Sequence, residues 1–309
     1  MKKVIVTGGA GFIGVHLVYE LLERQFEVTV IDKSVNKLLS NVKTNQKFLT
    51  LIESDVISAL ENNLVSLDEF DVVFHLAGVS VVSVSVKTPD VDMQANLLST
   101  FHLLERLRTS NNPPAIIFAS SAAVYGNPQK IPIMEGDPTY PLSPYGVSKL
   151  SAERYIDVYC KLYDIAGATL RIFSVYGPED KRVVHDIFRK LEENRERLFL
   201  LGNGSQERDF IYVEDVARAL FLVADRAPKM GEVYNVGSGR STSISQLAKE
   251  ICQAVGVSPK IEYENKERPD DPDISVANID RLKKLGFECK FSLQDGIKRI
   301  YDQKKKSEV

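Results

Sequence analysis

The sequence is poor in cysteine and has no long apolar run. Its three cysteines, Cys160, Cys252 and Cys289, lie far apart and are odd in number, which argues against a disulfide framework or a zinc site. We therefore expect no metal and a reducing, cytoplasmic location. No stretch reaches the roughly 18 apolar residues of a membrane span. The short apolar run after the two N-terminal lysines meets glycine too early for a signal peptide.

Charge of one sign is also scarce. Lys and Arg number 39 and Asp and Glu number 42, which gives a formal charge of −3. A chain with this charge balance is not expected to carry the large positively charged surface that binds nucleic acid or an anionic membrane, so we expect neither as a partner. The contents of 44% hydrophobic and 26% charged residues are those of a folded globular protein. At 309 residues, the chain is expected to form two domains or one large unit with an appended lobe.

Strand and helix patterns alternate along the first half of the chain. Short runs rich in Val and Ile alternate with amphipathic stretches, which is typical of a parallel sheet covered by helices. We expect helices at residues 12–24, 93–108 and 145–163. The alternation predicts an α/β fold, with a Rossmann-type doubly wound parallel sheet and a smaller C-terminal α/β lobe. Strands are expected at residues 4–7, 27–31, 48–52, 72–76, 115–119, 168–173 and 233–236.

The alternation breaks after Gly177 and Pro178, where segments rich in charge, Gly or Pro begin. Residues 210–225 still read as a strand followed by a helix, so the chain is expected to return to the first domain before leaving it again. We expect the sheet domain to comprise residues 1–175 plus about 209–238. The lobe is expected to comprise about 176–208 plus 239–309.

A glycine-rich loop follows the first expected strand and opens the first expected helix. Gly8 permits a tight turn, Gly11 lets the backbone approach a pyrophosphate, and Gly14 allows close packing of helix on strand. Asp32 ends the second strand, where a carboxylate accepts hydrogen bonds from ribose hydroxyls and repels a 2′-phosphate. This favours NAD over NADP, although Lys33 stands beside it. Asp55 fits an adenine contact or a surface turn equally well.

Tyr145 and Lys149 lie four residues apart, on one face of the third expected helix. A free tyrosine titrates near pH 10. A nearby ammonium, together with the positive nicotinamide of an oxidised coenzyme, would stabilise the phenolate and lower the pKa of the phenol, which would create a base that acts near neutral pH. The pair follows a strand that ends in Ser120 and Ser121.

These motifs resemble those of the extended short-chain dehydrogenases/reductases. Within that group the chain is similar to the NAD-dependent nucleotide-sugar epimerase/dehydratase family, with the UDP-glucose 4-epimerases nearest. The resemblance covers nearly the whole chain and rests on TGGAGFIG (7–14), HLAG (75–78), SSAAVYG (120–126), SPYGVSK (143–149), LRIFSVYGP (170–178), GNGSQERDFIYVEDVA (202–217), YNVGSG (234–239) and RPDDPD (268–273).

The resemblance implies roles for residues of the expected sheet domain, which would bind NAD. Tyr145 is the base, Lys149 is its electrostatic partner and a ribose ligand, and the Ser121 hydroxyl bonds the reacting oxygen. The residues expected to bind the coenzyme are Gly8, Gly11, Phe12, Ile13, Gly14, Asp32, Lys33, Asp55, Val56, Leu76, Ala77, Gly78, Asn96, Tyr145, Lys149 and Phe173.

The resemblance also implies that the lobe binds a UDP-sugar. Two arginines would clamp the diphosphate, an aspartate would meet the ribose, and apolar side chains would surround the base. The chain departs from the family at Ser80, Ser174 and a shortened segment, 179–183; Ser275 is a small residue at a size gate. The residues expected to bind substrate are Ser80, Ser121, Ser174, Val184, Phe199, Leu201, Arg208, Arg268, Asp271 and Ser275.

The residues after Ser121 favour one of the family's reactions. Dehydratases carry acidic residues at the positions of Ala122 and Ala123, because elimination of water needs a carboxyl group. We therefore expect a 4-epimerase that oxidises C4 to a 4-keto sugar, with Tyr145 taking the proton, and returns hydride to the opposite face. We expect UDP-glucose and UDP-galactose to be the substrates that it interconverts. UDP-N-acetylglucosamine or UDP-glucuronate epimerisation, or a net NAD(P)-dependent reductase or dehydrogenase, stay open. The family resemblance also implies a homodimer through helices 93–108 and 145–163.

Overall fold

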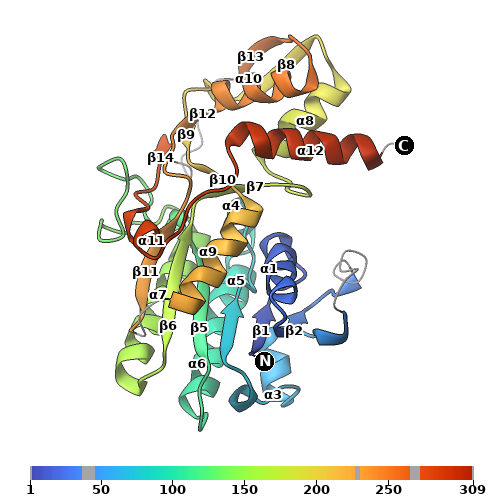
Figure 1. Ribbon diagram of the computed structural model, residues 1–309. Helices are drawn as coiled ribbons and strands as arrows, with labels where there is room; N and C mark the ends of the chain where they lie inside the picture. Colours follow the sequence, from blue (N-terminus) through green and yellow to red (C-terminus); the bar gives the residue numbers. More distant parts are fainter. Residues whose placement is uncertain (1, 37–45, 227–229, 265–271, 308–309) are drawn as a thin grey trace.

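A seven-stranded parallel sheet forms the centre of the molecule (Figure 1). The computed structural model describes residues 2–36, 46–226, 230–264 and 272–307. The strand order β11-β6-β5-β4-β1-β2-β3 contains the doubly wound order, so the expected fold class is confirmed. The strands are β1 (Lys3–Thr7), β2 (Glu27–Asp32), β3 (Leu49–Glu53), β4 (Val72–His75), β5 (Ala115–Ser121), β6 (Gly167–Ile172) and β11 (Glu232–Val236).

Helices cover both faces of this sheet. On one face, α1 (Phe12–Glu23) packs beside α9 (Val213–Arg226), and both bury apolar side chains in a core with β1, β2 and β6. The other face is covered by α3 (Val56–Glu61), α6 (Ser99–Arg108) and α7 (Pro144–Tyr163). Strands buried between two helical layers need apolar residues on both sides, which explains why they read as continuous runs of Val and Ile.

The helix expected at 93–108 is interrupted. The chain forms α5 (Pro89–Met93), a π-helical turn (Gln94–Leu98) and then α6. Asn96, in the middle of this turn, is fully buried, and its amide nitrogen donates to the Val79 carbonyl oxygen at 3.0 Å and to the Asp92 carboxylate at 2.8 Å. The apolar spacing of residues 93–108 did not predict this interruption, because it is the polar side chains of Asp92 and Asn96 that hold the widened turn in place.

A smaller C-terminal lobe lies above the sheet in Figure 1. Its own apolar core lies among α8 (Val183–Glu193), α10 (Ile244–Val255) and α12 (Leu293–Ser307). A parallel pair, β8 with β13, completes this core. The remaining elements are α4 (Val82–Lys87), β7 (Ser174–Tyr176), β8 (Arg197–Leu201), β9 (Glu207–Arg208), β10 (Phe210–Tyr212), β12 (Thr242–Ser243), β13 (Lys260–Glu264), β14 (Ile274–Ser275) and α11 (Asp280–Lys284).

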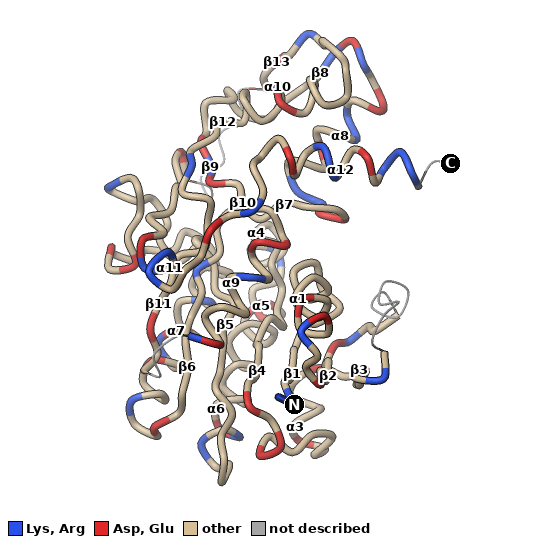
Figure 2. Tube along the Cα trace, in the orientation of Figure 1, with Lys and Arg blue, Asp and Glu red and all other residues tan. Residues whose placement is uncertain are grey.

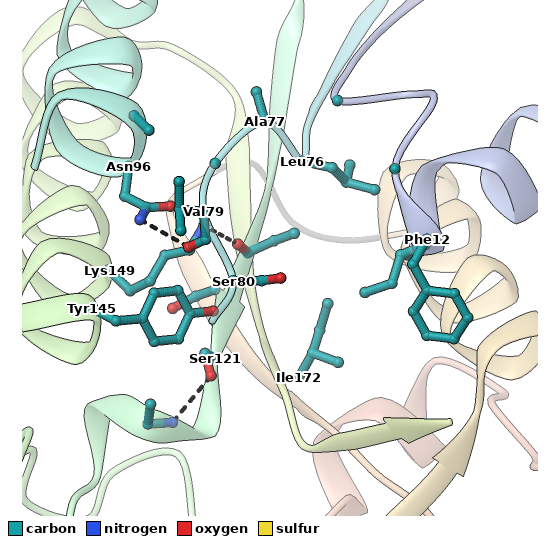
Figure 3. A pocket seen from close by; sticks show the side chains of 18 of the residues that line it. Phe12, Leu76, Ala77, Val79, Ser80, Asn96, Ser121, Tyr145, Lys149 and Ile172 are labelled. Atoms are coloured by element: carbon teal, nitrogen blue, oxygen red, sulfur yellow. Dashed lines mark hydrogen bonds between the residues drawn. The ribbon is translucent and has the colours of Figure 1, made fainter. Parts of the chain in front are cut away.

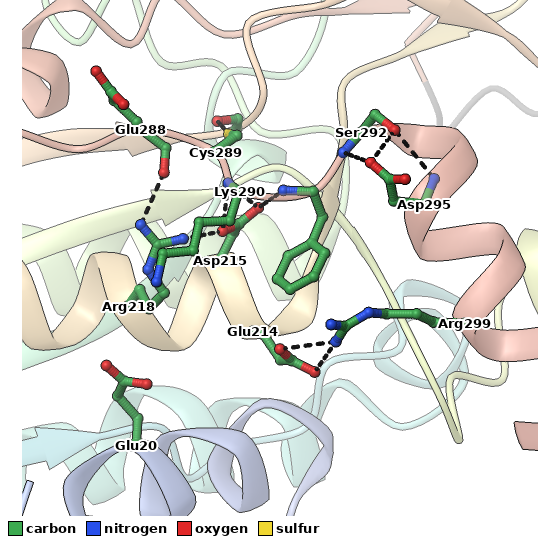
Figure 4. A network of polar contacts seen from close by, with 12 residues as sticks. Glu20, Glu214, Asp215, Arg218, Glu288, Cys289, Lys290, Ser292, Asp295 and Arg299 are labelled. Atoms are coloured by element: carbon green, nitrogen blue, oxygen red, sulfur yellow. Dashed lines mark hydrogen bonds and ion pairs between the residues drawn. The ribbon is translucent and has the colours of Figure 1, made fainter. Parts of the chain in front are cut away.

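Residues 210–226 and 232–236 return to the sheet domain: β10 pairs with β7, α9 packs on α1, and β11 is an edge strand of the sheet. Figure 4 shows how α9 also holds the segment that leads into α12. The fully buried Asp215 carboxylate accepts the backbone N–H groups of Lys290 (3.0 Å) and Phe291 (3.2 Å) and pairs with Arg218 at 2.5 Å. The domain boundaries themselves stay a prediction.

Charged residues of both signs are interspersed along the chain in the sheet domain and in the lobe (Figure 2). Across the described ranges, no helix is long and apolar enough to cross a membrane. The same residues include no group of three or more His, Cys, Asp or Glu side chains that could hold a metal ion. All three cysteines are free thiols, and Cys160 and Cys252 are buried.

Candidate functional site

A cavity of about 940 Å³ opens along the carboxyl ends of the sheet strands and reaches the lobe. In doubly wound sheets this crevice is where ligands bind. Its volume is at the upper end of the range of ligand pockets, which suits a dinucleotide beside a second ligand. Every residue expected to bind the coenzyme lines its wall: Gly8, Gly11, Phe12, Ile13, Gly14, Asp32, Lys33, Asp55, Val56, Leu76, Ala77, Gly78, Asn96, Tyr145, Lys149 and Phe173.

The glycine loop between β1 and α1 fits a pyrophosphate. Gly8 has a φ of +70°, which side chains rarely adopt, and a Cβ there would lie 2.7 Å from the Ala77 backbone nitrogen. A Cβ on Gly14 would lie 2.2 Å from the Gly8 carbonyl oxygen. The loop is therefore compact, and the first turn of α1 has no capping side chain. Its free N–H groups and the helix dipole favour an anion at this point.

Two carboxylates lie at the β2 and β3 side of the cavity. Asp32 accepts the backbone N–H of Ala10 at 3.0 Å and that of Ser34 at 3.1 Å, so it fixes the glycine loop as well as facing the cavity. Asp55 caps α3 and accepts the backbone N–H of Ser58 at 3.0 Å. That hydrogen bond lowers the pKa of Asp55. Asp55 thus caps a helix and also lines the cavity, and the expected adenine contact stays a prediction.

Tyr145, Lys149 and Ser121 meet on one side of the cavity, opposite Phe12 (Figure 3). Burial raises the pKa of Tyr145, and a hydrogen bond with Ser121 and the charge of Arg182 lower it. Within the protein, withdrawal of the phenol from water outweighs these neighbours. The expected lowering of the phenol pKa by Lys149 together with the positive nicotinamide of oxidised NAD stays a prediction.

The Lys149 ammonium donates to the Ala119 carbonyl oxygen at 2.9 Å, at the end of β5. Burial lowers the pKa of Lys149 to about 8, while the carboxylates of Asp92 and Glu153 oppose the shift. Asp92 is buried at 1% exposure and holds the Asn96 amide. Lys149 therefore lies in a polar cluster built from β5, α5 and α7.

The start of α7 is fixed from two sides. Ser143 caps the helix by accepting the Gly146 N–H at 3.2 Å. The fully buried Ser85 of α4 accepts the N–H of Tyr145 at 3.1 Å and donates to the Val82 carbonyl oxygen at 2.7 Å. These bonds position the first turn, which carries the tyrosine, against the cavity.

The residues expected to bind substrate divide into three groups. Ser80, Ser121, Ser174, Arg208 and Ser275 line the cavity. Arg208 lies on β9 opposite Ser275 of β14, and its Nη1 donates to the Glu207 carbonyl oxygen at 2.8 Å.

The apolar side chains expected around the base do not line this cavity. Val184 is 1% exposed within the core of the lobe, whereas Phe199 and Leu201 are exposed on β8. The other two predicted residues, Arg268 and Asp271, lie outside the described residues.

Residues 4–237 match the NAD dependent epimerase/dehydratase family. The chain belongs to this family. It is therefore an NAD-dependent enzyme of the nucleotide-sugar epimerase and dehydratase type.

Relatives of known sequence carry different activities in their names. The chain is 33% identical over 301 residues to a putative UDP-glucose 4-epimerase from Methanocaldococcus jannaschii, covering 96% of each chain. It is 30% identical over 317 residues to the human dTDP-D-glucose 4,6-dehydratase, covering 97% of this chain and 89% of that one.

Solved structures show the same division among substrates. A UDP-glucose 4-epimerase from Thermotoga maritima with UDP-glucose has a TM-score of 0.89 at 31% identity, covering 99% of this chain and all of the other. A UDP-N-acetylglucosamine 4-epimerase from Methanobrevibacter ruminantium has a TM-score of 0.87 at 32% identity, covering 98% and 99%. A UDP-glucuronic acid 4-epimerase variant from Bacillus cereus, with a fluorinated UDP-sugar and NAD, has a TM-score of 0.89 at 30% identity, covering 99% of both chains.

Three residues at the site had no place in the sequence prediction. Asp92 could have been found, because it lies four residues before Asn96 on one helical face. Ser85 and Arg182 gave no such signal, since each meets its partners only through the fold. Ser85 reaches α7 across 60 positions, and Arg182 lines the cavity from the segment that precedes α8.

Proposed function

We propose that the protein is a UDP-sugar 4-epimerase, with UDP-glucose and UDP-galactose as its first pair of substrates. The observation that carries the proposal is the wall beside Tyr145, formed by Ser121, Ala122 and Ala123. Within the described residues, the cavity's carboxylates are Asp32 and Asp55. β2, which ends in Asp32, lies three strands from β5, or about 14 Å at the usual strand spacing. A dehydratase would need a carboxyl group beside the sugar.

The residues present divide the work of a reversible oxidation. The Tyr145 phenolate accepts the proton of the sugar hydroxyl and returns it later, while Ser121 holds the same oxygen. The glycine loop, Asp32 and Lys149 would hold NAD, which supplies the hydride acceptor and, in the return step, the hydride donor. Small side chains at 122 and 123 leave space for the keto sugar to turn, so binding must rely on the nucleotide end.

One structural feature bears on which UDP-sugar the cavity accepts. Ser275 lines the cavity on β14, and its small side chain leaves room for an N-acetyl group. This supports UDP-N-acetylglucosamine as a second substrate, while UDP-glucuronate stays a further alternative. A net reductase or dehydrogenase would differ from all three epimerases, because it would consume coenzyme in each turnover.

A panel of UDP-sugars tests the proposal. Purified protein incubated with UDP-galactose and no added reductant is expected to give UDP-glucose, measured by chromatography of the products. UDP-N-acetylglucosamine and UDP-glucuronate serve as parallel substrates. Failure to interconvert any of the three would refute 4-epimerase activity. A stoichiometric change in coenzyme absorbance would instead identify a reductase or dehydrogenase.

We also propose that two copies associate through α5, α6 and α7. Val147, Tyr155, Val158 and Leu162 are 43–69% exposed, and their spacing places them along one side of α7. Met93 of α5 is 47% exposed. A stable interface covers about 800 Å² on each partner, and burying an apolar stripe of this kind favours such an association.

Light scattering during size-exclusion chromatography is expected to give twice the chain mass of 34.6 kDa. Val158→Glu places a charge in the stripe and is expected to give a single-chain mass. Leu201→Glu is the control, because Leu201 is 42% exposed on β8 of the lobe and is not part of this stripe. A wild-type mass of one chain would contradict the proposal, as would a Val158→Glu protein of unchanged size.

A further inference from the structure

The short segment 179–183 brings an arginine to the cavity wall. Arg182 directly precedes α8 and lines the cavity with Phe12 and Tyr145. Its guanidinium carbon lies 5.5 Å from the centre of the Phe12 ring, and its positive charge acts on the Tyr145 phenol. Phe12 is the first residue of α1, next to the glycine loop. Arg182 therefore lies between the expected pyrophosphate position and the catalytic tyrosine.

Arg182 is held in place by a buried partner. Its Nε lies 2.7 Å from the Asp180 carboxylate, whose side chain is 3% exposed, while the side chain of Arg182 is 49% exposed. This contact uses only the Nε–H donor of the guanidinium. Because a guanidinium carries five N–H donors, Nη1 and Nη2 keep donors for a ligand. A planar donor fork of this kind suits phosphate oxygens.

The other cations of the cavity are placed differently. The Lys149 ammonium is buried against the Ala119 carbonyl oxygen, and Arg208 Nη1 donates to the carbonyl oxygens of Glu207 and Asp273. Lys33 lies at the β2 side, next to Asp32. One cavity must nevertheless hold the diphosphate of NAD and that of a nucleotide sugar, two anionic groups that repel each other unless cations separate them.

We propose that Arg182 binds phosphate oxygens of one of these two diphosphates. The inference rests on the proposed nucleotide-sugar substrate. It adds a binding residue on the rim, in the segment 179–183 that the family resemblance led us to expect to be shortened. The coenzyme and the nucleotide sugar present the same chemistry, and separate titrations distinguish them.

The test measures binding without turnover. UDP is titrated calorimetrically into the NAD-loaded protein, and NADH is titrated by its fluorescence, for wild type, Arg182→Gln and Arg182→Lys. Hydrogen bonds to charged groups lead us to expect a loss of about 10- to 100-fold in affinity for one of the two ligands in Arg182→Gln. Arg182→Lys keeps the charge without the fork and is expected to lose less.

Arg189→Gln is the matched control. Arg189 lies on α8, the helix that Arg182 precedes, pairs with Asp186 at 2.7 Å and with Glu193 at 2.5 Å, and does not line the cavity. Its loss is expected to leave both affinities unchanged. A fall in UDP affinity would assign Arg182 to the nucleotide sugar, and a fall in NADH affinity would assign it to the coenzyme.

Wild-type affinity for both ligands in Arg182→Gln would overturn the inference. UDP-glucuronate is titrated as a third ligand. If Arg182→Gln lost affinity for UDP-glucuronate but kept its affinity for UDP, the inference would also be overturned, because the contact would then be with the sugar. A wild-type protein that binds NADH but not UDP would contradict the proposed function instead, and the NADH titration would then decide the role of Arg182.

Discussion

Tyr145→Phe is expected to lower kcat for UDP-sugar epimerisation about 10³-fold, within the range that general acid–base groups contribute. The phenol is 7% exposed, and its ring packs where α7 begins. Phe keeps the ring and removes only the oxygen that moves the proton. The KM for the UDP-sugar is expected to change little, because binding relies on the nucleotide end. Steady-state kinetics on UDP-galactose measures both constants.

Tyr155→Phe is the control for this variant, since Tyr155 lies on the same helix, is 43% exposed and does not line the cavity. It is expected to keep wild-type kcat. The pH profile gives a second readout. Ionisation of Tyr145, whose pKa burial raises, is expected to increase wild-type activity as pH rises, and activity is expected to level off once pH passes the Lys149 pKa of about 8, because the lysine then loses its charge. A Tyr145→Phe enzyme with kcat near that of wild type would exclude the phenol as the base.

Arg171→Met is expected to lower the free energy of unfolding by about 3–5 kcal/mol, the usual effect of breaking a buried ion pair. Arg171 of β6 and Glu153 of α7 are each 3% exposed, and Arg171 Nη2 lies 2.7 Å from the Glu153 carboxylate. Arg171 Nη1 also donates to the Glu135 carbonyl oxygen at 3.1 Å, and Glu153 accepts a bond from the Ser120 hydroxyl. The variant would leave a carboxylate buried without its cation. Urea denaturation followed by circular dichroism measures the loss.

The double variant Glu153→Met/Arg171→Met separates the pair from its surroundings. Replacing both charges by apolar side chains is expected to recover most of the lost stability. Arg108→Met breaks an exposed pair with Glu105, 2.7 Å apart, and is expected to change stability little. If Arg171→Met were as stable as wild type, water would reach the Arg171–Glu153 pair, and this pair would not stabilise the packing of α7 on the sheet.

The parts predicted best from sequence are those whose signals are local. The apolar run at residues 4–7 predicted the end of β1 at Thr7, the run at 115–119 stopped two residues before the end of β5 at Ser121, and the helix expected from residue 145 begins one residue earlier, at Pro144. Each of these signals lies within a few residues of the structure it specifies. The glycine loop has a local signal as well, in Gly8, Gly11 and Gly14, although Asp32 also holds the loop by accepting the N–H of Ala10.

The parts not predicted depend on contacts between distant segments. Arg171 and Glu153 read separately as a strand residue and a helix residue, and only the packing of α7 on β6 pairs them. Val184 is apolar and was expected at the nucleobase, but in the structure it faces the core of the lobe. A sequence pattern indicates that an apolar residue is buried, but it does not show whether that residue lies in the core of the lobe or beside a bound nucleobase.

The π-helical turn at residues 94–98 has a consequence for how this enzyme could evolve. It adds one residue to a turn and so rotates everything before it by about 100° relative to everything after it. Asp92 and Asn96 can then face Lys149 while Leu103, Leu104 and Leu107 stay against the sheet. Removal of one residue would give a more regular helix, but one of these two sets would turn away from its partners. The irregular turn is therefore the arrangement that lets a single helix serve both the core and the chemistry.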